Sequence, residues 1–313
     1  MIYHYLYQNK LFEGKKVFSF EKLHNINPKK IEFSLSIFGK IFSNIKKFFF
    51  GIVYYLIEIL GSYTFFYETY KKKNSQINKN CIFLGNGPSL NKLKIKDLKL
   101  FKKKGHKIFA VNHWTENVKY NSIIPDYIIL TDVRFFLKKK NKNKILYKRD
   151  KKLINYIRKN KNITLISPPK IVKILKNKFQ NNILTYSDTE FDFLYSSTNI
   201  FFPRGYSSIS IAKGIAVAKW LNFKKIFIIG IDNTYFRYMF SDKLNRILYL
   251  DIHSYKDNII VDYTKRYKSM FDYMMDHVKV FKAYEVFENK KNIYNLDEYS
   301  LTNFFTKKKF PNA

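Results

Sequence analysis

Glycine and polar residues that could hold a nucleotide follow a short apolar run in this sequence. The run Cys81–Leu84 leads directly into Gly85-Asn86-Gly87-Pro88-Ser89-Leu90. Two glycines let a backbone approach a ligand closely, and Pro-Ser favours a helix start whose free amides can hold an anion. The segment lacks the third glycine of a dinucleotide fingerprint and the Lys-Ser/Thr pair of a Walker loop. We expect Gly85–Ser89 to contact an anionic ligand; the alternative is an ordinary tight turn.

Polar residues also follow other apolar runs. Asn112 and Thr131-Asp132 come after two of them, and Asp232 follows Gly230 at the end of a third. Asn and Thr at strand ends can hydrogen-bond a base or a ribose, although they are also common in turns. A second phosphate-facing helix start is predicted within Pro203–Ser208. Its candidate phosphate contacts are Gly205, Ser207 and Ser208.

Three residues are candidates for catalysis. Tyr235 and Tyr238 follow Asp232 and could donate hydrogen bonds to a departing phosphate, unless their rings simply pack in the core. His253 stands in a polar stretch ahead of a predicted helix, where a neutral imidazole could take a proton from an acceptor hydroxyl. The alternative for His253 is a surface histidine, and His113 is then the next candidate base.

Strands and helices alternate along the second part of the chain. Apolar runs predict buried strands, and helices are expected from Pro88 to about residue 104, over 207–221 and over 262–288. This alternation predicts an α/β fold, a Rossmann-like doubly wound and mostly parallel sheet. Ligands then bind beyond the carboxyl ends of the strands, where the polar residues above are found. The predicted strands are 81–84, 108–111, 127–130, 163–166, 183–186, 226–229 and 293–294.

Residues 37–70 differ from the rest because they are rich in large apolar and aromatic residues. We expect a helix here and a polar linker over 71–80, so that residues 1–80 form an N-terminal membrane-associated segment and residues 81–313 the catalytic domain. An interfacial or self-associating helix, which could give a homo-oligomer, best fits Glu58 and the flanking lysines. A membrane span and a core helix are the alternatives, and a carboxylate at mid-membrane is costly. The N-terminus lacks the pattern of a signal peptide.

The charge and cysteine content limit the classes of function. The formal net charge is +34, which indicates either a nucleic-acid binder or a codon bias toward lysine together with attraction to an anionic membrane surface. The lysines are scattered and no nucleic-acid motif is present, so the membrane is the favoured partner and nucleic acid is disfavoured. The only cysteine, Cys81, lies in an apolar run and is expected to be a core residue in a reducing cytoplasm.

The motifs together resemble the bacterial sialyltransferases of glycosyltransferase family 42 and the related motility accessory factor family, over about residues 81–260. The resemblance rests on Gly85–Leu90, Asn112, and Ala216–Ala218 through Gly230–Asp232. It implies a GT-A-like fold and transfer of a sialic-acid-like sugar from a CMP-linked donor. In that family pattern Asn86 and Asn112 contact the donor, the tyrosine pair stabilises departing CMP, and His253 is the general base.

The expected activity is an inverting transfer to a cell-surface glycan such as lipooligosaccharide, capsule or glycoprotein, on the inner face of the cell membrane. No cofactor and no metal is expected, because no Asp-x-Asp motif follows a strand. Thr131-Asp132 departs from the sialyltransferase pattern, and the tyrosine spacing differs. Two rivals stay open: a diphosphokinase-like enzyme of the related family using Asp132 and Asp232 with Mg²⁺, and a non-enzymatic basic binder.

Overall fold

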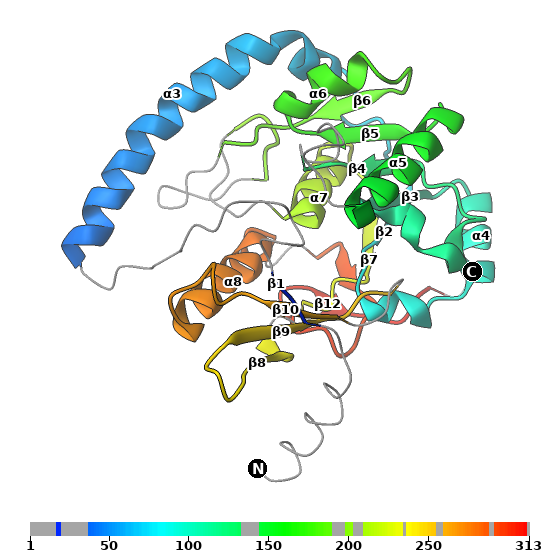
Figure 1. Cartoon of the computed structure of the whole chain (residues 1–313). Helices are drawn as coiled ribbons and strands as arrows, with labels where there is room; N and C mark the ends of the chain where they lie inside the picture. The colour runs from blue at the N-terminus through cyan, green and yellow to red at the C-terminus, as the bar shows by residue number, and fades with distance from the viewer. Residues whose placement is uncertain are drawn as a thin grey trace.

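The chain folds around an eight-stranded parallel sheet in the computed structural model, which describes residues 17–19, 37–132, 144–189, 198–202, 209–233, 236–254, 259–287 and 291–311. The strand order is β12-β11-β7-β2-β3-β4-β5-β6, and each neighbouring pair is parallel (Figure 1). Every strand predicted from an apolar run is present within two residues. The strands are β2 Asn80–Leu84, β3 Lys107–Val111, β4 Tyr127–Ile129, β5 Thr164–Ser167, β6 Ile183–Thr185, β7 Lys225–Ile229, β11 Ile293–Asn295 and β12 Thr306–Lys307.

Helices cover both faces of this sheet, which is why its central strands are apolar throughout. Helix α7 (Ser210–Trp220) and the end of α8 (Met270–Glu285) pack on one face. Helices α4 (Ile95–Lys103), α5 (Lys144–Lys159) and α6 (Pro169–Lys176) pack on the other. Two-sided cover confirms the predicted doubly wound α/β arrangement.

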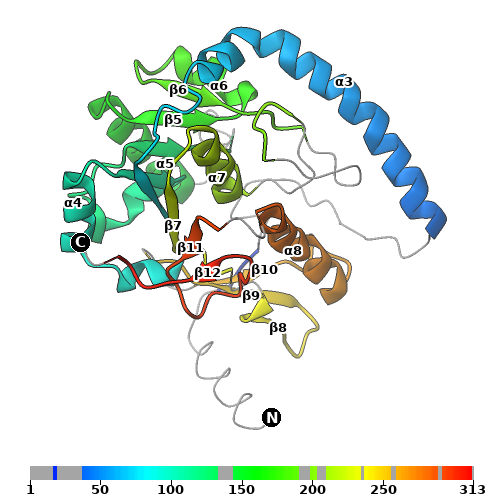
Figure 2. The ribbon, with the colours of Figure 1, turned by 180° about the vertical axis from the view of Figure 1, so that it is seen from behind.

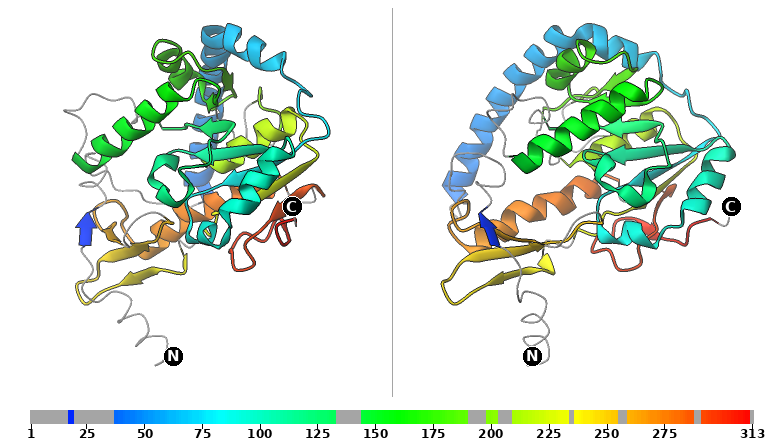
Figure 3. Two further views of the ribbon diagram at one scale, coloured as in Figure 1. Left: turned by 90° about the vertical axis from the view of Figure 1, so that its right-hand side faces the viewer. Right: turned by 45° about the vertical axis from the view of Figure 1, so that its right-hand side comes forward.

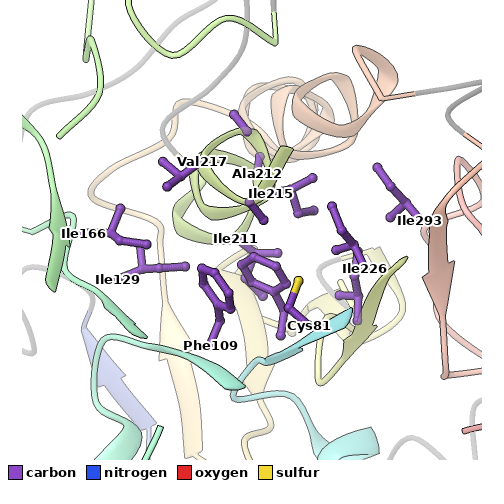
Figure 4. Close-up of a cluster of buried hydrophobic side chains, with 14 of the residues drawn as sticks. Cys81, Phe109, Ile129, Ile166, Ile211, Ala212, Ile215, Val217, Ile226 and Ile293 are labelled. Carbon is purple, nitrogen blue, oxygen red and sulfur yellow. The ribbon is translucent and has the colours of Figure 1, made fainter. Parts of the chain in front are cut away.

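The face under α7 holds the larger buried cluster, drawn in Figure 4. Ile211, Ile215 and Val217 of α7 are buried in this cluster together with Phe109 and other strand residues. Cys81 is fully buried in this cluster, and burial raises the pKa of its thiol well above the usual value. The prediction that Cys81 is a core residue is therefore confirmed.

A second sheet was not predicted. It contains β1 (Val17–Ser19), β8 (Met239–Ser241), β9 (Ile247–Asp251) and β10 (Ile259–Asp262), in the order β1-β10-β9-β8. The predicted helix over 262–288 is wrong at its start, because α8 begins at Met270. The reason is a local cap: the Ser269 hydroxyl accepts a hydrogen bond from the backbone N–H of Asp272 at 3.1 Å. Of the stretch before that cap, Asp262 ends β10 and the residues up to Ser269 form turns.

The predicted helix after Pro88 is also interrupted. The chain makes a 3-10 turn over Pro88–Lys92 and then turns into α4 at Ile95. Helix α7 begins at Ser210, and the residues 203–208 that were predicted to lead into it lie outside the described part of the chain.

The predicted N-terminal helix is present as α3, Ile37–Tyr70, with a break at Ser62 (φ −141°, ψ 17°). Its first part projects away from the sheet, as Figures 1 and 2 show, and its last turns lie beside β6 and α6 (Figure 3). Thr69 Oγ1 accepts a hydrogen bond from the backbone N–H of Thr185 at 2.9 Å. The last turns of α3 therefore cover the outer edge of the sheet at β6.

The exposed part of α3 is apolar. Over Phe48–Tyr70 the helix is long and apolar enough to cross a membrane, judged by length and composition alone, and only 11% of its most apolar stretch is buried. Among its most exposed side chains are Phe42, Phe49, Ile57, Leu60 and Tyr63. A core helix, one of the three alternatives, would bury these residues, so the structure disfavours that alternative.

Glu58 in this helix contacts the chain that follows β6. Its carboxylate accepts hydrogen bonds from Ser187 Oγ at 2.5 Å, Asp188 N at 2.8 Å and Thr189 Oγ1 at 3.3 Å. Burial raises the pKa of Glu58 above its usual value. The carboxylate that seemed misplaced in an apolar helix thus attaches α3 to the α/β domain.

Candidate active site

The carboxyl ends of β2 and β7 meet at the point where the strand order reverses, which is the usual ligand crevice of a doubly wound sheet. Here the Gly85 N–H donates to Ile229 O at 2.8 Å and the Gly87 N–H donates to Gly230 O at 2.8 Å. A Cβ atom on Gly85 would lie 2.2 Å from Gly230 O, and Gly230 has φ +77°. The two glycine turns can approach only because neither carries a side chain.

Ser89 and Asp232 join these turns. The Asp232 carboxylate accepts hydrogen bonds from Ser89 N at 3.1 Å and from Ser89 Oγ at 2.9 Å. Ser89 Oγ in turn accepts from Gly230 N at 3.0 Å. A Cβ on Gly87 would lie 1.9 Å from Asp232 Oδ2. Predicted donor contacts Gly85, Gly87, Ser89 and Asp232 are thus brought together, and they contact one another.

The carboxyl group of Asp232 has an unusual pKa. Burial, followed by the charge of Asp297, raises the pKa of Asp232 to about 6. Asp297 is itself buried and is paired with Lys92 at 3.0 Å. Asp232 is therefore a carboxylate that can carry a proton close to neutral pH.

Asn86 lies at the outer side of the same turn, within a small polar network. Asn117 Nδ2 donates to Asn86 Oδ1 at 3.1 Å, and Ser254 Oγ donates to Asn117 Oδ1 at 2.6 Å. The backbone N–H of Ser254 also donates to Asn86 O at 2.9 Å. This network holds the chain after β9 against the Gly85–Ser89 turn.

His253 immediately precedes Ser254 and so lies next to that turn. Its Nε2 is 3.0 Å from Asp251 Oδ1, and both side chains are partly exposed. An imidazole held by a carboxylate on one nitrogen is the arrangement used by general bases. His253 lies outside any helix or strand, as the sequence predicted, but it follows β9 directly, and β10 stands between it and α8.

A second polar cluster surrounds the first residue of α7. Asn112 Nδ2 donates to Ser210 Oγ at 3.1 Å, and Thr131 Oγ1 lies 2.7 Å from the same hydroxyl. Asn112 has φ +43°, and its Oδ1 is buried without a hydrogen-bond partner among the described residues. A buried acceptor without a partner requires an explanation. An N–H or O–H group of a bound ligand would provide the missing hydrogen bond.

The other predicted site residues are placed as follows. Pro88 opens the 3-10 turn, and Asp132 is partly buried after β4. Tyr238 is partly buried and packs against the apolar clusters of the small sheet. Tyr235, Gly205, Ser207 and Ser208 lie outside the described residues. His113, the second candidate base, has its Nε2 3.0 Å from Asp150 Oδ1 in α5.

Three residues of these clusters were not predicted. Asn117, Ser210 and Ser254 are ordinary turn and cap residues in the sequence. Only the meeting of distant segments gives them a role, so no local signal could have found them. Within the described ranges, no group of three or more His, Cys, Asp or Glu side chains is arranged to hold a metal ion.

Comparison with known proteins gives one family match. The family model described as 6-hydroxymethylpterin diphosphokinase MptE-like matches residues 58–237, more than half of the chain. The match begins inside α3, at the residue that attaches this helix to the α/β domain, and ends before β8. No curated protein matches the chain.

Two solved structures are similar at low identity. The MAf glycosyltransferase from Magnetospirillum magneticum AMB-1 is 13% identical over 74% of this chain, with a TM-score of 0.40, and this chain spans only 35% of that protein. The sialyltransferase CstII from Campylobacter jejuni, in complex with CMP-3FNeuAc, is 19% identical over 73% of this chain and 86% of its own length, with a TM-score of 0.40.

Proposed function

Because this chain belongs to the 6-hydroxymethylpterin diphosphokinase MptE-like family, we propose that it transfers a group from a nucleotide-activated donor to an acceptor hydroxyl. The donor lies at the carboxyl ends of β2, β3 and β7. The specific reaction that we propose is transfer of a sialic-acid-like sugar from a CMP-linked donor to a cell-surface glycan.

One observation carries this proposal. The bond from Ser254 N to Asn86 O holds His253 and its carboxylate partner Asp251 beside the glycine turn. A proton acceptor therefore lies next to the crevice between β2 and β7, where we propose that the donor binds. The orphan Oδ1 of Asn112 supports the same interpretation, since it can accept a hydrogen bond from the base or ribose.

The proposed reaction is a direct displacement. His253 takes the proton of the attacking acceptor hydroxyl, the acceptor oxygen forms a bond to the anomeric carbon, and the bond from that carbon to the phosphate oxygen breaks. CMP leaves with the bonding electron pair, and the anomeric centre is inverted. Asp251 stabilises the imidazolium that forms. Tyr235 and Tyr238 are the proposed hydrogen-bond donors that stabilise charge on the departing phosphate.

The proposed location is the inner face of the cell membrane. The exposed apolar side of α3 would lie in the membrane surface, with the lysines of this basic chain facing anionic headgroups. No cofactor or metal ion takes part in the reaction that we propose.

Nucleotide binding tests the proposal. Thermal unfolding of the full chain is measured with CMP, CDP, UDP, GDP and ATP, each with and without Mg²⁺. A ligand at about 100 times its Kd stabilises the folded state by roughly 2.7 kcal/mol. We expect cytidine nucleotides to stabilise the protein and ATP with Mg²⁺ to have no effect. Stabilisation by ATP with Mg²⁺ alone would contradict a CMP-sugar transferase.

The family match favours a second candidate, transfer of diphosphate from ATP to a hydroxymethyl group. That reaction needs carboxylates for Mg²⁺. Asp132 and Asp232 are the nearest candidates, but Asp232 already accepts two hydrogen bonds from Ser89. Activity that EDTA abolishes would support this second candidate, and activity that survives EDTA would support the sugar transfer.

A further inference from the structure

A cavity of about 730 Å³ lies between α3 and α6, away from the candidate active site. One wall is the side of α3 that faces α6, and the other is the first turns of α6. Glu58, Asp188 and Thr189 lie at its base. The wall residues on which the argument depends are Tyr54, Ile57, Gly61, Pro169, Lys170 and Lys173.

Two lysines of α6 reach into the space beside α3. Lys170 Nζ lies 4.9 Å from the centroid of the Tyr54 ring. Lys173 Nζ is the nearest atom to the position that a Cβ on Gly61 would take, at 3.8 Å, so the missing side chain leaves room for the ammonium group. Being three residues apart, both lysines project from the same side of α6.

The charge on these lysines is not balanced by an ion pair among the described residues. Of the described residues, none places a carboxylate within ion-pair distance of either ammonium group. The two acidic residues at the base are engaged elsewhere: Glu58 with the segment after β6, and Asp188 in an ion pair with the buried Lys213. The cavity thus presents two ammonium groups that can bind an anion.

The walls indicate what kind of anion would bind. Phe50, Tyr54 and Ile57 line the α3 side and are exposed by 59%, 56% and 63%. They continue directly into the exposed apolar side of α3. A free phosphate gains nothing from these side chains, whereas a molecule with a phosphate at one end and a hydrocarbon chain at the other buries apolar area against them.

We propose that the cavity between α3 and α6 binds a single anionic phospholipid, whose phosphate lies between Lys170 and Lys173 and whose acyl chain lies along α3. This inference rests on the membrane association proposed above, and it adds a defined lipid site to it. A lipid held between two elements would fix the angle at which α3 meets the membrane.

The test uses the full chain and vesicles of phosphatidylcholine with or without phosphatidylglycerol. The Lys170→Gln, Lys173→Gln variant is compared with Lys148→Gln, Lys151→Gln, a matched pair of exposed lysines three residues apart on α5. The net charge of the two variants is the same. Each lysine close to an anionic surface raises the affinity for that surface by about tenfold or less. We therefore expect the α6 variant to lose roughly 10–30-fold in affinity for phosphatidylglycerol vesicles. The α5 variant should lose less than about threefold.

Equal losses in both variants would overturn the site, because they would show a diffuse attraction. Inorganic phosphate is added at millimolar concentration as a second control. If it displaces the wild type from vesicles but not the α6 variant, the lysines form a free-phosphate site, which also overturns the proposal. A third variant, Gly61→Leu, keeps the charge but fills the space beside Lys173. Native mass spectrometry should show less retained phosphatidylglycerol for this variant than for the wild type; equal retention would contradict the site.

The proposed enzymatic function is tested separately in the same samples. CMP should stabilise all four proteins equally, because the cavity is away from the glycine turn. A wild type that binds phosphatidylglycerol but not CMP would refute the transferase and leave the lipid site intact. A wild type that binds CMP but no vesicles would refute the lipid site and leave the transferase intact.

Discussion

The junction between Ser89 and Asp232 makes a quantitative prediction about pH and stability. The change is Asp232→Asn, which keeps an oxygen for Ser89 but cannot ionise. Because burial raises the pKa of Asp232 from 3.8 to about 6, folding favours the protonated form. The stability that this group contributes is therefore fully present below pH 3.8 and is lost as the pH rises through 6.

The magnitude follows from that difference in pKa. At about 1.4 kcal/mol for each unit of pKa, the rise to about 6 corresponds to roughly 3 kcal/mol. This is an upper limit, because water partly screens a carboxylate that is only partly buried. Part of this stabilisation is already lost at pH 4.5, so about 2 kcal/mol of it is lost between pH 4.5 and pH 7.5.

The assay is urea unfolding of wild type and variant at both pH values. We expect the stability of the wild type minus that of Asp232→Asn to fall by about 1–2 kcal/mol from pH 4.5 to pH 7.5. Any fixed cost of the altered hydrogen bonds cancels in this comparison. Asp242→Asn is the control, since Arg246 lowers the pKa of Asp242 and the difference should stay flat or rise with pH. A flat or rising difference for Asp232→Asn would refute the reasoning.

Three further predictions follow from other contacts. Gly85→Ala should lower stability by about 3 kcal/mol or more, because the new Cβ meets the backbone oxygen of Gly230; a melting temperature within about 2 °C of the wild type would contradict this close approach. Glu58→Ala should cost about 1–3 kcal/mol by leaving the Asp188 amide without its acceptor, and faster hydrogen exchange at that amide is the measurement, with unchanged exchange as the contrary result. His253→Ala should lower turnover by ~10²–10⁴-fold without changing stabilisation by CMP, and near-normal turnover would assign the base elsewhere.

The parallel sheet could be predicted because its strands are buried on both faces and therefore read as apolar runs between turns. The same logic fails for the small sheet, where β8 is short and contains no fully buried residue, and β10 fully buries only its two central residues. Strand β12 contains only Thr306–Lys307, both exposed, and nothing in the sequence distinguishes it from a loop. Its pairing with β11 depends on tertiary contact.

The site was predictable to a similar extent. The Gly85–Ser89 turn is visible in the sequence because two glycines follow a strand. Its bonds to Asp232 and Ser254 join residues more than 140 positions apart, and no local pattern reports them. Glu58 shows the limit most plainly, since its apolar surroundings suggested a membrane surface while its carboxylate bonds to the protein.

The cover that α3 provides over β6 has a consequence for how the protein assembles. A strand at the border of a sheet carries unpaired backbone groups that can recruit a strand from another molecule. The side chain of Thr69 accepts a hydrogen bond from one such group, the amide of Thr185, and the last turns of α3 lie alongside the rest of β6. A chain shortened to begin after α3 would expose this border, so its dimers or aggregates would form by strand addition. Such species would reflect the loss of the helix, and the native oligomeric state must be measured with α3 in place.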